Sequence, residues 1–249
     1  MVQGLSQVAF TAPTPSRSLQ QVTTDTDTTA LAPSRWLRAT AWGFIIGSTL
    51  FALGVPLSLV AGLSPSVAGW TFFAGSIFFT AAALLQFLSS REALEPLEAT
   101  SPRGWLTAVG RPRTTDWTAS ALQFVGTLAF NLSTFRAAVD ATGETGPYSL
   151  VWRPDVIGSI LFLVSSWIAF APEVRWRRHR HARNRSWAIG ALNFLGSVLF
   201  GLSAIGAYLV PAEDTLLNVQ WANGGTVLGA LCFLAGAILL LPRRSRRPA

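Results

Sequence analysis

Hydrophobic residues along this chain are gathered into six long runs that polar segments separate. Within each run the apolar residues are continuous rather than alternating, and about 20 of them are enough for a helix to cross the hydrocarbon of a bilayer. We expect helices, because lipid offers no water to the open edge of a sheet. The predicted spans are Ala39–Leu63, Ser66–Leu88, Trp117–Ala138, Asp155–Glu173, Trp187–Val210 and Trp221–Leu241. The predicted fold class is an all-α polytopic membrane protein with six transmembrane helices.

A five-residue signature recurs in all six runs: a glycine, a small residue, two variable residues and a phenylalanine. It begins at Gly47, Gly75, Gly126, Gly158, Gly196 and Gly229, and it ends at Phe51, Phe79, Phe130, Phe162, Phe200 and Phe233. The third run, from Trp117 to Ser133, also aligns without gaps on the fifth, from Trp187 to Ser203. We therefore interpret the chain as a helical hairpin used three times.

The three hairpins divide the chain into seven segments. Residues 1–35 are too poor in apolar side chains to offset the entropy of ordering, so they predict a disordered cytoplasmic tail. The other segments are hairpin repeat 1 at 36–88, a cytoplasmic loop at 89–116, hairpin repeat 2 at 117–174, a basic cytoplasmic loop at 175–186, hairpin repeat 3 at 187–241 and a basic cytoplasmic tail at 242–249.

The glycine and the phenylalanine of the signature stand four residues apart and so share a helix face. A notch that admits a neighbouring backbone then adjoins a ring that can cover it, and such close packing holds helices together in lipid. We predict that all six signature glycines are helix-packing residues. The Gly-xxx-Gly spacings at Gly43/Gly47 and Gly225/Gly229 further predict that the first and last helices meet and close the bundle.

Charge sets the predicted orientation of the spans. Half of the 249 residues are apolar and only 12% are charged, which does not suit a soluble domain. Every basic residue is Arg, and 17 of the 19 lie before the first span, between the second and third, between the fourth and fifth, or after the last. By the positive-inside rule, both termini face the cytoplasm of a cell-membrane protein.

The densest basic run joins the fourth and fifth spans. Arginines beside a bilayer attract anionic lipid, so we predict contact between this run and lipid headgroups. The residues concerned are Arg175, Arg177, Arg178, Arg180, Arg183 and Arg185. Nucleic-acid binding is not favoured, because a short tether between two helices presents no fold for readout. The expected partners are membrane lipids, while a protein partner or a homo-oligomer is left open.

Four polar residues within the third and fifth spans are candidates for a site: Gln123, Asn131, Arg136 and Asn193. Two interpretations are open for the three amides, which either bridge helices or line a polar cavity. Two are also open for Arg136, near the outer end of its span. It pairs with Asp140 or Asp155 while reaching the headgroups, or it contacts an anion together with Arg153.

No pattern of catalytic or metal-binding residues accompanies the repeat, so we expect no enzyme, no cofactor and no metal. Nucleophile-elbow, zinc-protease, phosphate-loop and dinucleotide-loop patterns are absent from the sequence. His179 and His181 lack partners at a metal-like spacing. Cys232 is interpreted as a packing residue.

The segment Phe194–Phe200 resembles the YrhK-like two-helix membrane domain of bacteria. The segments Trp152–Asp155, Trp187–Tyr208 and Gly225–Phe233 resemble uncharacterised multi-pass proteins of actinobacteria, and the resemblance covers about residues 36–241. It implies membrane residence and brings no chemistry or functional residue.

Two classes of function follow. The first is a structural or accessory membrane protein, a helical bundle that binds lipid or a partner. The alternative is a small-solute carrier or channel, whose polar cavity is lined by the third and fifth helices.

Overall fold

The computed structural model describes residues 32–92, 115–143, 146–177 and 185–242. These residues form six long helices and one short ribbon: α3 (Ala32–Ser58), α4 (Pro65–Glu92), α6 (Thr115–Asp140), α7 (Ser149–Arg177), α8 (Arg185–Gly206), β1 (Leu209–Val210), β2 (Thr215–Leu216) and α9 (Val219–Leu240). The prediction of an all-α fold is confirmed at this level. The bundle discussed below belongs to the unit Trp36–Ala249.

Five of these helices are long and apolar enough to cross a membrane, where the sequence predicted six. The exception is α6, which has 26 residues and is therefore long enough. Its composition is the reason, because Gln123, Asn131 and Arg136 interrupt its apolar residues together with several threonines and serines. Among the described residues, five helices are therefore candidate spans by length and composition, and the membrane crossing of α6 is a proposal.

Several predicted boundaries are wrong by one to two turns. The first helix ends at Ser58, soon after Pro56, and the amide of Leu59 closes the turn on the Pro56 carbonyl oxygen at 3.1 Å. α7 begins at Ser149, earlier than the predicted Asp155. Most of the predicted tail, residues 1–31, lies outside the described residues, but Ala32–Arg35 already belong to α3.

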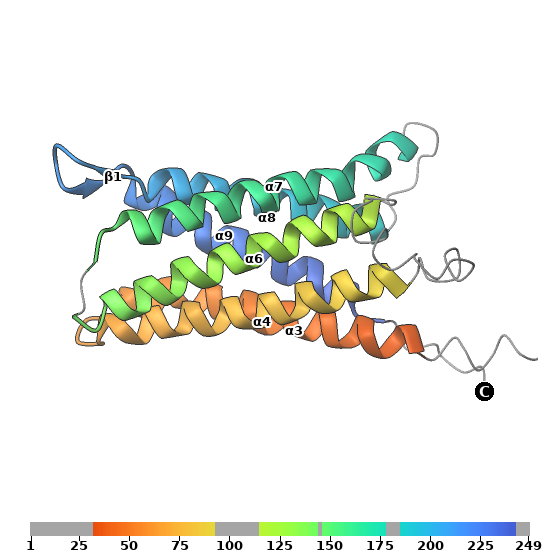
Figure 1. Ribbon diagram of the computed structural model, residues 1–249, viewed down its shortest axis with the longest axis horizontal. Coiled ribbons are helices and arrows are strands. Elements are labelled where there is room, and N and C mark those ends of the chain that lie inside the picture. The colour runs from red at the N-terminus through yellow and green to blue at the C-terminus, as the bar shows by residue number, and fades with distance from the viewer. Residues whose placement is uncertain (1–31, 93–114, 144–145, 178–184, 243–249) are drawn as a thin grey trace, which may run out of the picture. The chain divides into compact units, whose positions relative to one another are not determined.

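The chain leaves α8 at Gly206 rather than at Val210 because it turns into a two-stranded ribbon. β1 and β2 pair antiparallel, with Leu209 opposite Leu216. The turn between them holds Asp214 at a positive φ of 51°, a conformation that Asp tolerates better than most residues. Figure 1 shows this ribbon at the same end of the bundle as the α3–α4 and α6–α7 connections.

The helices bury small and hydroxyl-bearing side chains and turn aliphatic ones outward. The buried polar residues are Thr40, Ser48, Ser76, Ser120, Thr127, Ser133, Ser159, Ser165, Ser166, Ser197 and Ser203. On the outer faces, Leu132 is 58% exposed, Ile160 55% and Leu228 53%. A soluble protein shows the opposite distribution, so the outer surface of this bundle suits a hydrocarbon solvent.

Candidate functional site: an amide-lined cavity beside a phenylalanine core

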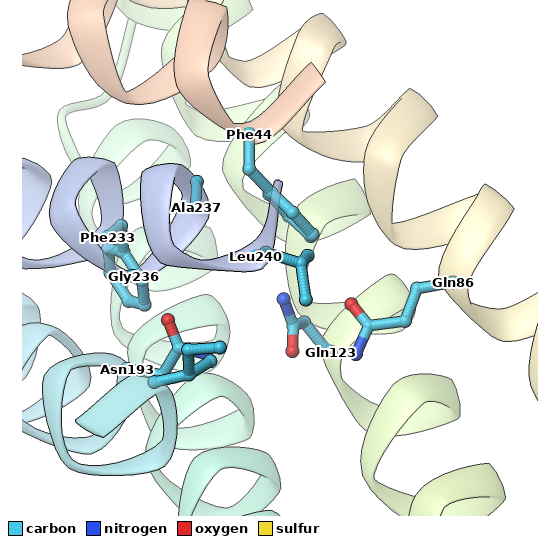
Figure 2. A pocket seen from close by; sticks show the side chains of 9 residues that line it. Phe44, Gln86, Gln123, Asn193, Phe233, Gly236, Ala237 and Leu240 are labelled. Atoms are coloured by element: carbon cyan, nitrogen blue, oxygen red, sulfur yellow. The ribbon is translucent and has the colours of Figure 1, made fainter. Parts of the chain in front are cut away.

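A cavity of about 80 Å³ lies among the last turns of α4 and α9 and the first turns of α6 and α8. Figure 2 shows the amide groups of Gln86 and Gln123 turned toward one another, with Asn193 beside Gly236. Phe44, Ile189, Phe233, Ala237 and Leu240 complete the wall. The cavity therefore combines three uncharged amides with an apolar surround, near the end of the bundle opposite the α3–α4, α6–α7 and α8–α9 connections.

The backbone positions of two amides follow from the repeat. Gln123 lies three residues before Gly126, and Asn193 lies three residues before Gly196, so each stands one turn before its signature glycine on the same helix face. The corresponding residue of α3 is Phe44, three residues before Gly47. The cavity thus brings together the equivalent positions of α3, α6 and α8.

Gln86 is the cavity residue that the sequence analysis missed. It follows Leu84 and Leu85 in an apolar run near the end of α4. An amide in such a run is a signal in itself, since a polar group in a predicted span needs a partner or a function. No equivalent polar residue in another repeat drew attention to it.

The six signature phenylalanines meet beside the cavity, near the middle of the bundle. All six side chains are buried: Phe51, Phe79, Phe130, Phe162, Phe200 and Phe233. Ring centroids lie 5.1 Å apart between Phe130 and Phe162, and 5.3 Å apart between Phe200 and Phe233. The Phe79 ring contacts the rings of both Phe162 and Phe233. The edge-to-face contacts among these rings stabilise the core beyond their burial.

Each signature glycine faces the signature of the helix to which its own helix is paired along the chain. A Cβ added to Gly158 would lie 3.1 Å from the carbonyl oxygen of Gly126 and 3.1 Å from the Phe130 ring. A Cβ added to Gly196 would meet the Gly229 carbonyl oxygen and the Phe233 ring at the same distances. Gly47 and Gly75 face one another in the same way.

The Gly-xxx-Gly pairs do not join the first and last helices, so that prediction is wrong. Gly43 faces Ala82 of α4, and Gly225 faces the backbone of Leu199 and Ser203 in α8. Both pairs are used within a helical hairpin, because the short connection brings successive helices together and the small residues let their backbones approach.

Of the four polar residues singled out in the sequence, only Gln123 and Asn193 line the cavity. Arg136 forms an ion pair with Asp140, with 2.8 Å between Nη2 and Oδ1, and lies against Gly146, at the other end of α6. The Oδ1 atom of Asn131 is buried without a hydrogen-bond partner among the residues that the structure describes. The structure therefore brings two of the four together and separates the other two.

At the end of the bundle that holds the β1–β2 ribbon, two hydrogen bonds join the start of α7 and the residue before it to the end of α8 and the residue after it. The indole Nε1 of Trp152 donates to the Ala204 carbonyl oxygen at 2.8 Å, and the Tyr148 hydroxyl donates to that of Ala207 at 2.9 Å. Burial, and after it the charge of Asp155, raise the pKa of the Tyr148 hydroxyl above its ordinary value. Because the ordinary tyrosine pKa of 10.0 already lies well above neutral pH, the hydroxyl is protonated there with or without this shift and keeps its hydrogen bond.

The predicted headgroup-binding arginines are described at one position only. The guanidinium of Arg185 donates to the carbonyl oxygens of Leu239 and Leu241, at the carboxyl end of α9. Arg178, Arg180 and Arg183 lie outside the described residues, as do His179 and His181. Arg175 and Arg177 are placed in α7 by their backbone alone.

Within the described ranges, no group of three or more His, Cys, Asp or Glu residues could hold a metal ion. Cys232 is a free, half-buried thiol in α9. No family model, curated protein or solved structure matches the chain, so the resemblance to the YrhK-like domain has no support from these comparisons and remains a prediction.

Proposed function

We propose that this chain is a six-span membrane protein of the structural or accessory class, a closed bundle that binds lipid along its outer faces. The observation that supports the proposal best is the reversed distribution of side chains. Leu, Ile and Val are exposed on the outer faces, while Ser, Thr and Gly fill the seams between helices. In a bilayer the exposed aliphatic residues need no protein partner.

Equivalent contacts in the second and third hairpins support the interpretation of the bundle as a repeated hairpin. Ser133 donates to the carbonyl oxygen of Val151 at 2.8 Å, and Ser203 donates to that of Ala222 at 2.6 Å. Each serine stands seven residues after a signature glycine, and each acceptor stands seven residues before the next one.

The seams between successive hairpins repeat as well. Phe87 of α4 contacts Trp117 at 5.8 Å and stacks on Phe124 at 6.2 Å between ring centroids. Phe170 of α7 contacts Trp187 and stacks on Phe194 at 6.0 Å in both cases. Because the four partners occupy matching places in the alignment of α6 with α8, the same join is used twice.

The phenylalanine core argues against a conducting path. Its rings are in contact from helix to helix, so a solute crossing at this level would have to displace several of them. Membrane carriers generally place charged groups or broken helices at midplane. Near the middle of this bundle lie Phe rings and buried hydroxyls instead.

A small-solute carrier is the second candidate, and the shared cavity of Gln123 and Asn193 favours it. Flux through liposomes that contain the purified chain separates the two. When urea or glycerol is added outside, liposomes first shrink and then swell again as the solute enters. The accessory function predicts that liposomes with the chain swell at the same rate as protein-free ones. A faster rate that Gln123→Leu abolishes would establish the carrier and overturn the closed bundle.

A further inference from the structure

The amide-lined cavity has the properties of a ligand site in its own right. Its volume of about 80 Å³ is room for a few water molecules or for one compact solute. Phe44 and Phe233 belong to both the cavity wall and the buried core, so the phenylalanine core closes the cavity on one side. The cavity is therefore a blind pocket near the ends of α4 and α9.

The three amides are available to a ligand. Among the described residues, the side chains of Gln86, Gln123 and Asn193 make no hydrogen bond with another protein group. Each amide offers two N–H donors and one carbonyl acceptor. The side chain of Gln86 is exposed and those of Gln123 and Asn193 are half-buried, so a molecule in the cavity can reach all three amides, and they suit one that both donates and accepts hydrogen bonds.

The lining also limits the charge of the ligand. No charged side chain is among the described residues of the wall. A charged solute would lose its hydration without gaining a counter-charge, which is strongly unfavourable. Ile189, Phe233 and Leu240 provide an apolar patch beside the amides, which suits a short hydrocarbon part.

We propose that this pocket binds a small uncharged molecule whose head both donates and accepts hydrogen bonds and which carries a short apolar group, such as a primary carboxamide. The inference goes beyond the proposed function, because a closed bundle holds such a pocket without conducting. The basic segments of the sequence place this end of the bundle on the cytoplasmic side.

Propionamide is the probe that tests the pocket, with propionate as its charged counterpart. The full chain, purified in detergent, is titrated while the side-chain NH₂ signals of Asn and Gln are followed by ¹H–¹⁵N correlation spectra. We expect saturable shifts of the Gln123 and Asn193 signals with propionamide and none with propionate. Absence of saturation, or equal shifts with propionate, would overturn the proposal.

A matched pair of glycine variants localises the binding. A Cβ at Gly236 would stand 3.0 Å from the Asn193 Oδ1 atom and intrude on the pocket, whereas a Cβ at Gly224 of the same helix meets nothing within 4 Å. Gly236→Ala should weaken propionamide binding by about tenfold or more, and Gly224→Ala should leave it unchanged. Equal affinity in the two variants would contradict the assignment.

Gln123→Leu removes one amide while filling its space, and Gln220→Leu, at the exposed opposite end of α9, is its control. Loss of binding in the first variant alone supports the pocket. If Gln123→Leu does not fold, the glycine pair still decides. The closed bundle is tested by liposome flux and the pocket by propionamide binding, so failure of propionamide binding leaves the proposed function standing.

Discussion

At the scale of single residues, the approach of paired helices depends on glycines that have no space for a side chain. A Cβ at Gly225 would lie 2.5 Å from the Leu199 carbonyl oxygen and 2.8 Å from the Ser203 amide nitrogen. Both neighbours are backbone atoms, so they cannot turn aside as a flexible side chain could. The adjacent Gly224 faces open space.

This contrast predicts different effects of the same substitution at neighbouring positions. Gly225→Ala should lower the free energy of unfolding by about 1–3 kcal/mol, because the methyl group forces α8 and α9 apart. Gly224→Ala should have a neutral or slightly stabilising effect, since Ala favours helix. Thermal or SDS-induced unfolding in detergent measures both, and equal losses would show that the α8–α9 seam is not closely packed.

The phenylalanine core offers a second pair of neighbours. Phe79 is 4% exposed and contacts Phe51, Phe162 and Phe233, whereas Phe78 is 40% exposed. Phe79→Ala should cost about 3–5 kcal/mol of stability, because it leaves a cavity among the rings. Phe78→Ala should cost much less in the same unfolding assay. Comparable losses would remove the evidence for a shared core.

The sequence identified most of the residues that matter at this scale. The spacing of Gly and Phe is local, and the helix period converts it directly into a shared face. Which residues share the cavity is a long-range matter, because Gln86, Gln123 and Asn193 come from three different helices. These three side chains meet, and Asn131 lies away from them, because of the way each helix is rotated about its own axis. No local sequence pattern encodes that rotation.

At the scale of helices, α9 ends on an unusual cap. The last carbonyl groups of a helix have no partner within it and carry partial negative charge. The Arg185 guanidinium, which comes from the first residue of α8, donates to the Leu239 and Leu241 carbonyl oxygens. The positive charge of Arg185 is unfavourable beside the positive end of the α8 dipole, but it is favourable beside the negative end of the α9 dipole.

Loss of this cap should loosen the α8–α9 pair. Arg185→Gln should lower stability by about 1–2 kcal/mol, because the carbonyl groups lose a charged donor. Arg153→Gln is the control, since the Arg153 side chain is exposed. Unfolding midpoints in detergent report the difference. If both variants unfold alike, Arg185 acts as a surface charge, and binding to anionic lipid becomes its better explanation.

Helices were easier to predict than the ways in which they pair and end. Continuous apolar runs specify long helices, and all six were found. The β1–β2 ribbon was missed because strands of two residues are too short to show alternation. The partner of each Gly-xxx-Gly face was assigned wrongly, because small residues indicate a close contact without saying which helix supplies it.

At the scale of the whole molecule, the account depends on the bilayer as solvent. The exposed aliphatic faces and the hydroxyl-rich seams both follow from it. Whether α6 crosses the membrane is the open point, since its residues are less apolar than those of the other five helices. Its buried serines and threonines lie in seams with α4 and α7. The hydroxyl oxygens of Ser90 and Ser120 are 3.0 Å apart, and the Ser165 hydroxyl donates to the Ala119 carbonyl oxygen.

Neighbouring helices therefore cover the buried hydroxyl groups of α6, which favours a sixth span. If α6 crosses the membrane, the residues before and after it lie on opposite sides. Thr142, in the turn after α6, is exposed, and Thr100 lies in the segment before it.

Cysteine labelling on either side of α6 is the most direct test. Thr100→Cys and Thr142→Cys are each placed in a Cys232→Ala background, and intact cells are treated with a membrane-impermeant maleimide. The account predicts that Thr142→Cys is labelled in intact cells and Thr100→Cys only after permeabilisation. Labelling of both positions from the same side, or in the reverse order, would contradict it.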